Sequence, residues 1–330
     1  MDKLELPFPA FGLGRFSVAG CTPFMGVVLE DSAMALQALA PLAQRMGAVW
    51  PCPVEQSPFE QWPALFDVLS RVIAEFAEDE AFESAKIPLE RLRIHAPFQP
   101  RQAFCTIANY RSGAVQARLD AARAAAIEAC EQRLRDGQPY VSNKLPTSVI
   151  GPFDAIALPA HVRQPDWEVE LGVVIGKEAR NVKREDAMSC VAGYTVVNDI
   201  TVRELVSRHE PQGMGTDWLQ AKNAPGFLPV GPWVVPAAFV PDPYALRMTL
   251  RLNGELMQDE KTGDMIFDIA AQIEYVSRHV RLLPGDLLCT GAPAGFGLHY
   301  GRFLEPGDMV QAGIDGLGGQ RNECRREGAA

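Results

Sequence analysis

The sequence has little of what marks nucleic-acid-binding, membrane or secreted proteins. Its 31 Lys and Arg are outnumbered by 41 Asp and Glu, which gives a net charge of −10. Nucleic acids and anionic membrane surfaces attract clustered basic side chains, so this balance argues against both as partners. No apolar run approaches the roughly 18 residues that span a bilayer. The start, "MDKLELPFPAFGLG", lacks a basic segment followed by an apolar one. We therefore expect a cytoplasmic protein.

Paired cysteines are also missing. The seven cysteines are scattered, odd in number and without a C-x-x-C pair, which is typical of reduced thiols rather than of a disulfide framework or a zinc site. The early "GLGRF" is not a phosphate-binding loop, because the full G-x-G-x-x-G spacing is absent and no βαβ unit follows. The remaining composition, 47% hydrophobic and 22% charged, is ordinary for a globular protein.

The chain divides into two regions that differ in their predicted secondary structure. The first hundred residues mix a strand-like run, "FMGVVLE", with helical periodicity over residues 32–43 and 62–76, and proline-rich breaks at 51–58 and 97–100 punctuate them. We predict a small N-terminal α+β domain over residues 1–100 and a larger domain over 101–330.

The larger region reads mostly as β-structure. An amphipathic helix is predicted over residues 114–136, as an insertion before short strand-like runs that begin near residue 149. Asn253-Gly254 between two alternating runs predicts a tight hairpin. A second helix is predicted over 264–278, capped by Thr262 or Asp264. Many strands with few helices favour an α+β fold built as a β-sandwich or roll over a doubly wound sheet.

Acidic residues at two predicted strands are the first indication of a functional site. In "DWEVELGVVIG", Glu168 and Glu170 stand at i and i+2, so both carboxylates leave the same face of the strand. One interpretation is a solvated strand face. The other is a strand buried on both sides, whose carboxylates need a compensating cation. Asp199 ends the next apolar run, "AGYTVVND", and three such carboxylates together would suit Mg²⁺, Mn²⁺ or Ca²⁺.

Two further segments admit a functional and a plain interpretation. Lys222 in "DWLQAKNAPGFLPVGP" is either an exposed loop lysine or a desolvated one beside a bound anion. In "LLCTGAPAGFG", Thr290 and the backbone N–H groups around Gly291 could hold a carboxylate or an enolate oxygen, although a Gly/Ala/Pro turn needs no ligand.

Taken together, these segments resemble the fumarylacetoacetate hydrolase family. Besides those quoted, the resemblance is carried by "LNGELMQDEKTGDMIFDIAAQIEYVSR" and "FLEPGDMVQAGIDGLGGQRNEC"; it covers about 145–324, in the family's order, with a looser match at Asn109-Tyr110. It implies a mixed β-roll core, a small N-terminal domain, homodimers and a Mg²⁺ or Mn²⁺ site. By the same resemblance, the expected metal carboxylates are Glu168, Glu170 and Asp199, and the expected substrate contacts are Asn109, Tyr110, Lys222, Thr290 and Gly291.

The resemblance implies a hydrolase that cleaves a C–C bond in a 1,3-diketo or 2-oxo acid through a metal-stabilised enolate. Hydrolytic members carry N-Y-x-x-H-x-x-E, whose His/Glu pair activates water; here those two positions are Gly113 and Gln116. The family's T-G-T-P-A-G turn also has Ala292 at its second threonine.

Three explanations of these departures stay open. His209 and Glu210, in a glycine-flanked loop, could supply the base; the reaction could be a decarboxylation or keto–enol isomerisation that needs no activated water; or the chain could be a non-catalytic relative. An apolar or aromatic substrate tail is a further hypothesis, from Phe227, Trp233, Phe296 and Tyr300 near the motifs.

Overall fold

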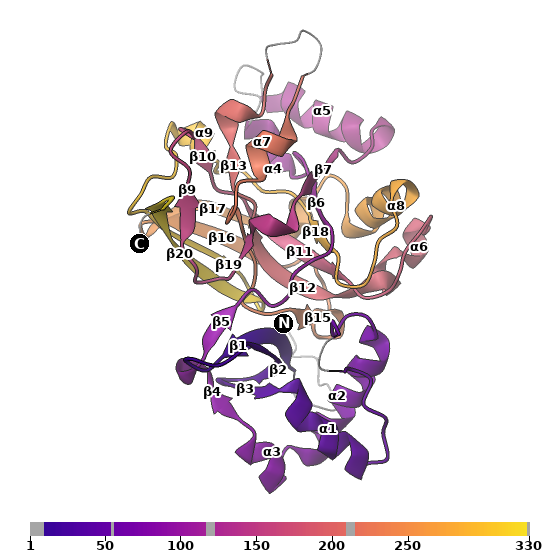
Figure 1. Ribbon diagram of the computed structural model, residues 1–330. Helices are drawn as coiled ribbons and strands as arrows, with labels where there is room; N and C mark the ends of the chain where they lie inside the picture. The colour runs from indigo at the N-terminus through magenta and orange to yellow at the C-terminus, as the bar shows by residue number, and fades with distance from the viewer. Residues whose placement is uncertain (1–9, 54–55, 117–122, 209–214, 329–330) are drawn as a thin grey trace.

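The computed structural model describes residues 10–53, 56–116, 123–208 and 215–328. Its N-terminal part, in the lower half of Figure 1, is an antiparallel sheet in the order β4-β3-β2-β1-β5 with helices beside it. The strands are β1 (Gly12–Ser17), β2 (Phe24–Leu29), β3 (Ser32–Ala35), β4 (Ile87–Pro88) and β5 (Arg93–His95). The helices are α1 (Leu36–Arg45), α2 (Trp62–Phe76) and α3 (Glu80–Ser84).

The helical periodicity of this part predicts α2 correctly and α1 only in part. The helix predicted over residues 62–76 is confirmed. The one predicted over 32–43 is wrong at its start, because Ser32–Ala35 pairs with β2 as a strand before α1 begins at Leu36. Four residues are too few to separate the two periodicities, and pairing with a neighbouring strand decides between them.

Two larger sheets form the centre of the remaining part, in the upper half of Figure 1. A six-stranded mixed sheet has the order β15-β12-β11-β18-β6-β7, and a five-stranded one has the order β17-β16-β19-β20-β9. The first sheet contains β6 (Ala103–Thr106), β7 (Val141–Lys144), β11 (Val169–Ile175), β12 (Val191–Asn198), β15 (Val235–Pro236) and β18 (Leu287–Cys289). The second contains β9 (Ile156–Leu158), β16 (Arg247–Leu252), β17 (Glu255–Lys261), β19 (Met309–Ile314) and β20 (Gly318–Arg326).

Four short strands form two further pairs, β10 (Pro165–Asp166) with β13 (Thr201–Val202) and β8 (Val149–Ile150) with β14 (Leu228–Pro229). Asn253 and Gly254 both have positive φ, 54° and 88°, and join β16 to β17 as the hairpin predicted from the sequence. The mixed sheets with helices around them confirm the predicted α+β class.

Strand β11 is buried on both faces. Val169, Leu171 and Val173 belong to the core between the two large sheets, together with Leu250 of β16. Val174, on the other face, packs in a second core with residues of the N-terminal part. The two parts of the chain therefore share a core, and their division near residue 100 stays a prediction. Glu168 and Glu170 are consequently not on a solvated strand face.

The remaining helices are α4 (Arg111–Gln116), α5 (Arg123–Asp136), α6 (Arg184–Ala187), α7 (Trp218–Lys222), α8 (Ile269–His279) and α9 (Gly297–Tyr300). The helix predicted over 114–136 corresponds to α4 and α5, with residues 117–122 outside the described part of the chain.

The prediction for α8 is wrong at its start. The helix begins at Ile269, because the side chain of Asp268 caps it by accepting from Ala271 N at 2.8 Å. Thr262 and Asp264 lie in a separate 3₁₀ turn, where Asp264 accepts instead from Ser112 N at 2.7 Å.

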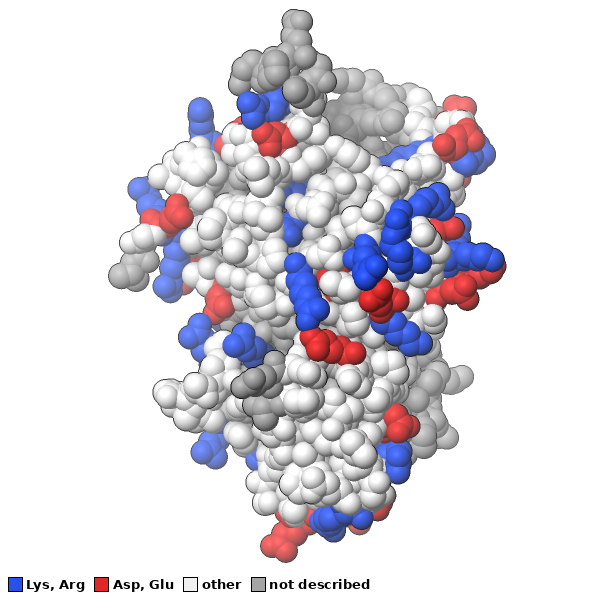
Figure 2. All heavy atoms as spheres, turned by 45° about the vertical axis from the view of Figure 1, so that its right-hand side comes forward, with Lys and Arg blue, Asp and Glu red and all other residues white. Residues whose placement is uncertain are grey.

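One face of the protein carries charged side chains of both signs (Figure 2). On the face shown in Figure 2, acidic and basic side chains are interspersed among broad uncharged areas. Within the described ranges, no helix has both the length and the apolar character needed to cross a bilayer.

Candidate active site

Antiparallel pairing of β11 with β12 assembles the acidic cluster. Val169 pairs with Asn198, which places Glu168, just before β11, beside Asp199, just after β12; the Asp199 N–H donates to Glu168 O at 2.9 Å. Glu170 leaves the same face of β11. One carboxylate oxygen from each of the three residues lies within 4.8 Å of the other two, and the residues are only 7%, 1% and 0% exposed.

Basic side chains of the protein itself neutralise two of these acids. Lys222, at the end of α7, places Nζ 2.5 Å from Asp199 Oδ2 and 3.1 Å from Glu168 Oε2. Lys144 of β7 places Nζ 2.5 Å from Asp199 Oδ1, and Arg203 places Nη2 2.7 Å from Glu168 Oε1. The protein itself therefore supplies the compensating cations for two of the three acids.

Glu170 differs from its two neighbours. Among the described residues it forms no ion pair, and its Oε2 accepts only from Gly291 N, at 2.7 Å. Burial raises the pKa of Glu170 well above its usual value, and repulsion from Asp199 and Glu168 adds to the increase. A hard divalent cation suits three carboxylate oxygens at this spacing, and it would supply the charge that Glu170 lacks.

Neighbouring charges together affect the pKa values of Asp199 and Lys222 more strongly than burial does. Burial alone would raise the pKa of Asp199, but Lys144 and Lys222 hold it well below its usual range. Burial alone would lower the pKa of Lys222, but Asp199 and Glu168 raise it above its usual value. These two residues therefore form a carboxylate–ammonium pair at neutral pH.

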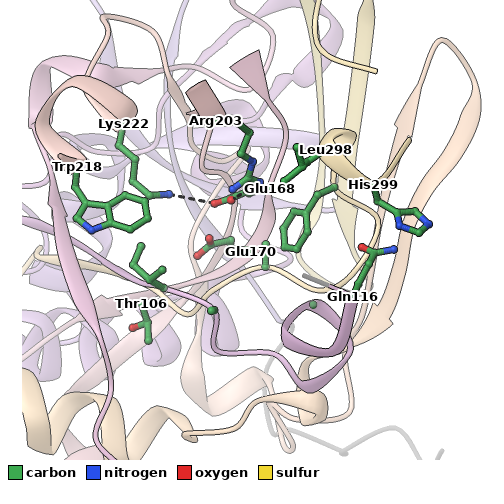
Figure 3. A pocket seen from close by; sticks show the side chains of 14 residues that line it. Thr106, Gln116, Glu168, Glu170, Arg203, Trp218, Lys222, Leu298 and His299 are labelled. Carbon is green, nitrogen blue, oxygen red and sulfur yellow. Dashed lines mark hydrogen bonds and ion pairs between the residues drawn. The ribbon is translucent and has the colours of Figure 1, made fainter. Parts of the chain in front are cut away.

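Two members of the cluster, Glu168 and Glu170, line the floor of a cavity of about 150 Å³ (Figure 3), and the third, Asp199, is buried behind them. Charged lining residues are confined to this floor: Glu168, Glu170, Arg203 and Lys222. The walls and mouth are formed by Thr106, Ile107, Ala108, Gly113, Gln116, Trp218, Ala292, Phe296, Leu298 and His299. Gln116 and His299 lie together, away from the acidic pair (Figure 3). The cavity thus has carboxylates that could chelate a cation and basic side chains at its floor, and mostly apolar side chains around its walls.

Three of the expected substrate contacts are buried behind the cavity instead of lining it. Asn109, Tyr110 and Thr290 are each 0% exposed, and the Asn109 side chain donates to Thr290 O and Phe267 O, both at 2.9 Å. The Tyr110 hydroxyl lies 3.4 Å from Thr290 Oγ1. Gly291 supplies the N–H that orients Glu170, and its φ of 97° favours glycine. Direct substrate contact by these four residues stays a prediction.

The structure shows the surroundings of the two positions that lack the His/Glu pair. A Cβ on Gly113 would lie 3.0 Å from Ala292 O and 3.3 Å from the Phe296 ring, so the position is crowded. Gln116 is occupied, because its Oε1 accepts from Gly295 N at 2.6 Å. His209 and Glu210, the alternative base, lie outside the described residues.

Several residues of the site escaped the sequence reasoning. Arg203 lies four residues after Asp199 in the sequence, and it also bonds to buried Asp166 through Nε at 2.7 Å. Lys144 is brought to Asp199 by the pairing of β6 with β7, and no sequence pattern near either residue indicates this contact. Trp218 and His299 line the cavity from short helices. Of the aromatic residues tied to a substrate tail, Phe296 lines the cavity, whereas Phe227 is fully buried and Trp233 packs on Gly12.

Comparison with known proteins identifies relatives of this chain. Residues 102–325 match the family model described as "Fumarylacetoacetate (FAA) hydrolase C-terminal". The chain is 42% identical over 189 residues to 2,4-didehydro-3-deoxy-L-rhamnonate hydrolase of Sphingomonas sp. (strain SKA58), covering 56% of this chain and 65% of that protein. It is 40% identical over 191 residues to mitochondrial oxaloacetate tautomerase of Rattus norvegicus, covering 57% and 59%. The chain thus spans about three fifths of the length of these relatives.

A solved structure extends the likeness to nearly the whole chain. Maleylpyruvate hydrolase from Sphingobium sp. SYK-6, in complex with manganese(II) and pyruvate, superposes with a TM-score of 0.69 at 26% identity, covering 96% of this chain and 99% of that one. Because the family model matches most of the sequence and the fold agrees, the chain belongs to the fumarylacetoacetate hydrolase family.

Proposed function

We propose that this chain catalyses keto–enol proton transfer in a 2-oxo acid, as a tautomerase or isomerase that depends on Mg²⁺ or Mn²⁺. One observation carries the proposal: Glu168, Glu170 and Lys222 line the cavity and Asp199 lies directly behind them, while the positions expected to activate water hold Gly113 and Gln116. The site thus has the groups that stabilise an enolate, and the described residues lack the pair expected to activate water.

Glu168, Glu170 and Asp199 would hold the cation. When bound there, a divalent ion acts as a Lewis acid that draws electron density from a 2-oxo acid and favours its enolate. The donor set fits, because all three ligands are oxygen atoms and Glu170 has no basic partner among the described residues. The manganese in the related maleylpyruvate hydrolase supports the same choice.

Lys222 is the proposed catalytic side chain. Its Nζ is fixed by Asp199, Glu168 and Thr201, the last at 2.8 Å, and its raised pKa keeps it an ammonium. The charge faces the cavity, where it opposes negative charge that develops on a substrate oxygen. For proton transfer, one of these three hydrogen bonds must open so that Nζ can give that proton to the enol carbon, and Nζ then regains a proton from the enol hydroxyl, which leaves the charge of the site unchanged.

Hydrolytic C–C cleavage of a β-diketo acid, of the acylpyruvate or fumarylacetoacetate kind, is the second candidate. The same floor would stabilise the enolate leaving group, and a relative at 42% identity is named a hydrolase. This candidate needs a base for water, which His209, Glu210 or the cavity-lining His299 would have to supply. Homodimer assembly and cytoplasmic location also remain predictions; the rat relative is named as mitochondrial.

Proton NMR in D₂O separates the candidates. The protein with Mg²⁺ is incubated with pyruvate, oxaloacetate and an acylpyruvate, and the protons next to the carbonyl are followed. Catalysed exchange with intact substrate supports the tautomerase, two acid or ketone fragments support the hydrolase, and released CO₂ would indicate a decarboxylase. Lys222→Met should abolish the reaction, whereas Lys261→Met, at an exposed lysine of β17, should not. No change in any substrate would contradict both candidates.

A further inference from the structure

The cavity separates charge from apolar surface. Its charged groups lie at the floor, and the part that a substrate tail would meet is the apolar wall, defined here as Ile107, Trp218, Ala292, Phe296 and Leu298. We propose that the substrate is a 2-oxo acid whose tail is apolar, an aryl or branched alkyl group, and that tails bearing a carboxylate or several hydroxyls are disfavoured. This inference rests on the proposed function and names its substrate class.

The cations of the floor are already engaged, which argues against a tail carboxylate. Arg203 binds Glu168 and Asp166, and its guanidinium stacks over the Phe296 ring at 4.8 Å. Lys222 is held by Glu168 and Asp199. A carboxylate against the apolar wall would lose water without gaining a free cation among the described residues, and such burial is unfavourable.

Polar partners for a hydroxylated tail are equally scarce. Ala292 and Gly113 line the cavity where the resemblance implies threonine and histidine. The Thr106 hydroxyl donates its hydrogen bond to Gln272 Oε1 at 2.7 Å. The side-chain oxygen of Gln116 accepts from Gly295 N. His299 stands apart from the floor beside Gln116 (Figure 3). A polyhydroxy tail would leave most of its hydroxyls unpaired in this enclosure.

Two aromatic rings of the apolar wall are held in place. Trp218 donates from Nε1 to the Tyr140 hydroxyl at 2.7 Å, and the two rings meet edge to face at 6.1 Å. Phe296 is held by the stacked Arg203 guanidinium. Fixed aromatic faces favour a flat apolar partner, because little side-chain freedom is lost when it binds.

Three inert analogues that share one 2-oxo acid head test the tail separately from the head. Oxamate has no tail, N-phenyloxamate has a flat apolar tail, and N-oxalylglycine has a carboxylate tail. Their dissociation constants are measured by calorimetry with Mg²⁺ and with EDTA. We expect all binding to require Mg²⁺, N-phenyloxamate to bind roughly tenfold or more tighter than oxamate, and N-oxalylglycine to bind no tighter than oxamate.

Variants locate the effect on the wall. Leu298→Gln should remove roughly threefold or more of the preference for N-phenyloxamate over oxamate. Leu219→Gln, at a leucine of α7 that is 68% exposed and does not line the cavity, is the matched control.

The outcomes separate the inference from the proposed function. Mg²⁺-dependent oxamate binding with no gain from the phenyl group, or with tighter N-oxalylglycine, overturns the apolar-tail inference alone. No Mg²⁺-dependent binding of any analogue overturns the proposed function, and the inference with it.

Discussion

The Nζ atom of Lys222 lies between two of the three clustered carboxylates, 2.5 Å from Asp199 and 3.1 Å from Glu168. The protein thus places its own cation where a divalent ion would seek oxygen ligands. Lysine and metal compete for the same oxygens, so the charge of Lys222 both stabilises the metal-free fold and opposes metal binding.

Replacing Lys222 by methionine tests this dual role. We expect Lys222→Met to lower the stability of the EDTA-treated protein by about 3–5 kcal/mol, because it leaves buried Glu168 and Asp199 short of one positive charge. Mg²⁺ should restore more stability to this variant than it adds to the wild type. Thermal unfolding with EDTA and with Mg²⁺ measures both effects, and Lys261→Met serves as the control. Equal melting temperatures for wild type and Lys222→Met in EDTA would show that the ion pair contributes nothing.

Glu170 should make the metal-free protein sensitive to rising pH. Its pKa is raised in the folded state, chiefly by burial, so the folded protein binds this proton more tightly than the unfolded chain does. This contribution is fully present below the unfolded pKa of about 4.3 and is lost as pH rises through the raised folded value. We therefore expect Glu170→Gln to be more stable than the wild type at pH 7 by more than about 1 kcal/mol, with the gap closing toward pH 4. Urea unfolding in EDTA at both pH values measures it; a gap that widens toward pH 4 would contradict the prediction.

Asn109 is expected to act through the fold behind the cavity. Its side chain makes three buried hydrogen bonds, donating to Phe267 O and Thr290 O and accepting from Phe267 N at 3.0 Å. Asn109→Ala should cost about 2–4 kcal/mol of folding free energy, since buried backbone groups lose their partners. Denaturant unfolding tests the loss of stability, and oxamate calorimetry tests contact with the substrate head. A stable variant that no longer binds oxamate would instead identify Asn109 as a direct substrate contact.

Restoring the missing pair should not create a hydrolase. A histidine at position 113 would crowd Ala292 O and Phe296, and the following turn is anchored by Gln258, which donates to Pro293 O at 3.0 Å. We expect Gly113→His combined with Gln116→Glu to lose about 1–3 kcal/mol of stability by overpacking and to gain no hydrolysis of acylpyruvates. Chromatographic detection of the two cleavage fragments is the measurement. Efficient cleavage by the double variant would contradict this prediction and would show that the turn shifts to accommodate the histidine.

Local periodicity predicted much of the fold and the two strands beside which the acidic cluster lies. Alternation along "EVELGVVIG" and "GYTVVND" predicted β11 and β12, and pairing of these two strands is what brings Glu168 and Asp199 together. The hairpin at Asn253-Gly254 was predictable for the same reason, because its backbone conformation depends on two adjacent residues.

Contacts between residues that are distant in the sequence explain the features that local patterns did not predict. Residues 264–268 have apolar spacing that suits a helix, but Asn109 binds the backbone of Ile266 and Phe267 and holds this segment out of helical geometry. The charge balance of the acidic cluster depends on Lys144 and Arg203, which come from other elements and leave no pattern around Glu168. A sequence motif can therefore nominate metal carboxylates without revealing which cations the protein already places beside them.

Manganese titration of the wild type and of Glu168→Ala tests the central claim most directly, with free Mn²⁺ followed by electron paramagnetic resonance. We predict one Mn²⁺ per wild-type chain, an affinity at least about 100-fold weaker in Glu168→Ala with the fold retained, and no change in the control Glu255→Ala, at an exposed residue of β17. A folded Glu168→Ala protein that binds Mn²⁺ as tightly as the wild type would contradict the assignment of this cluster as a metal site.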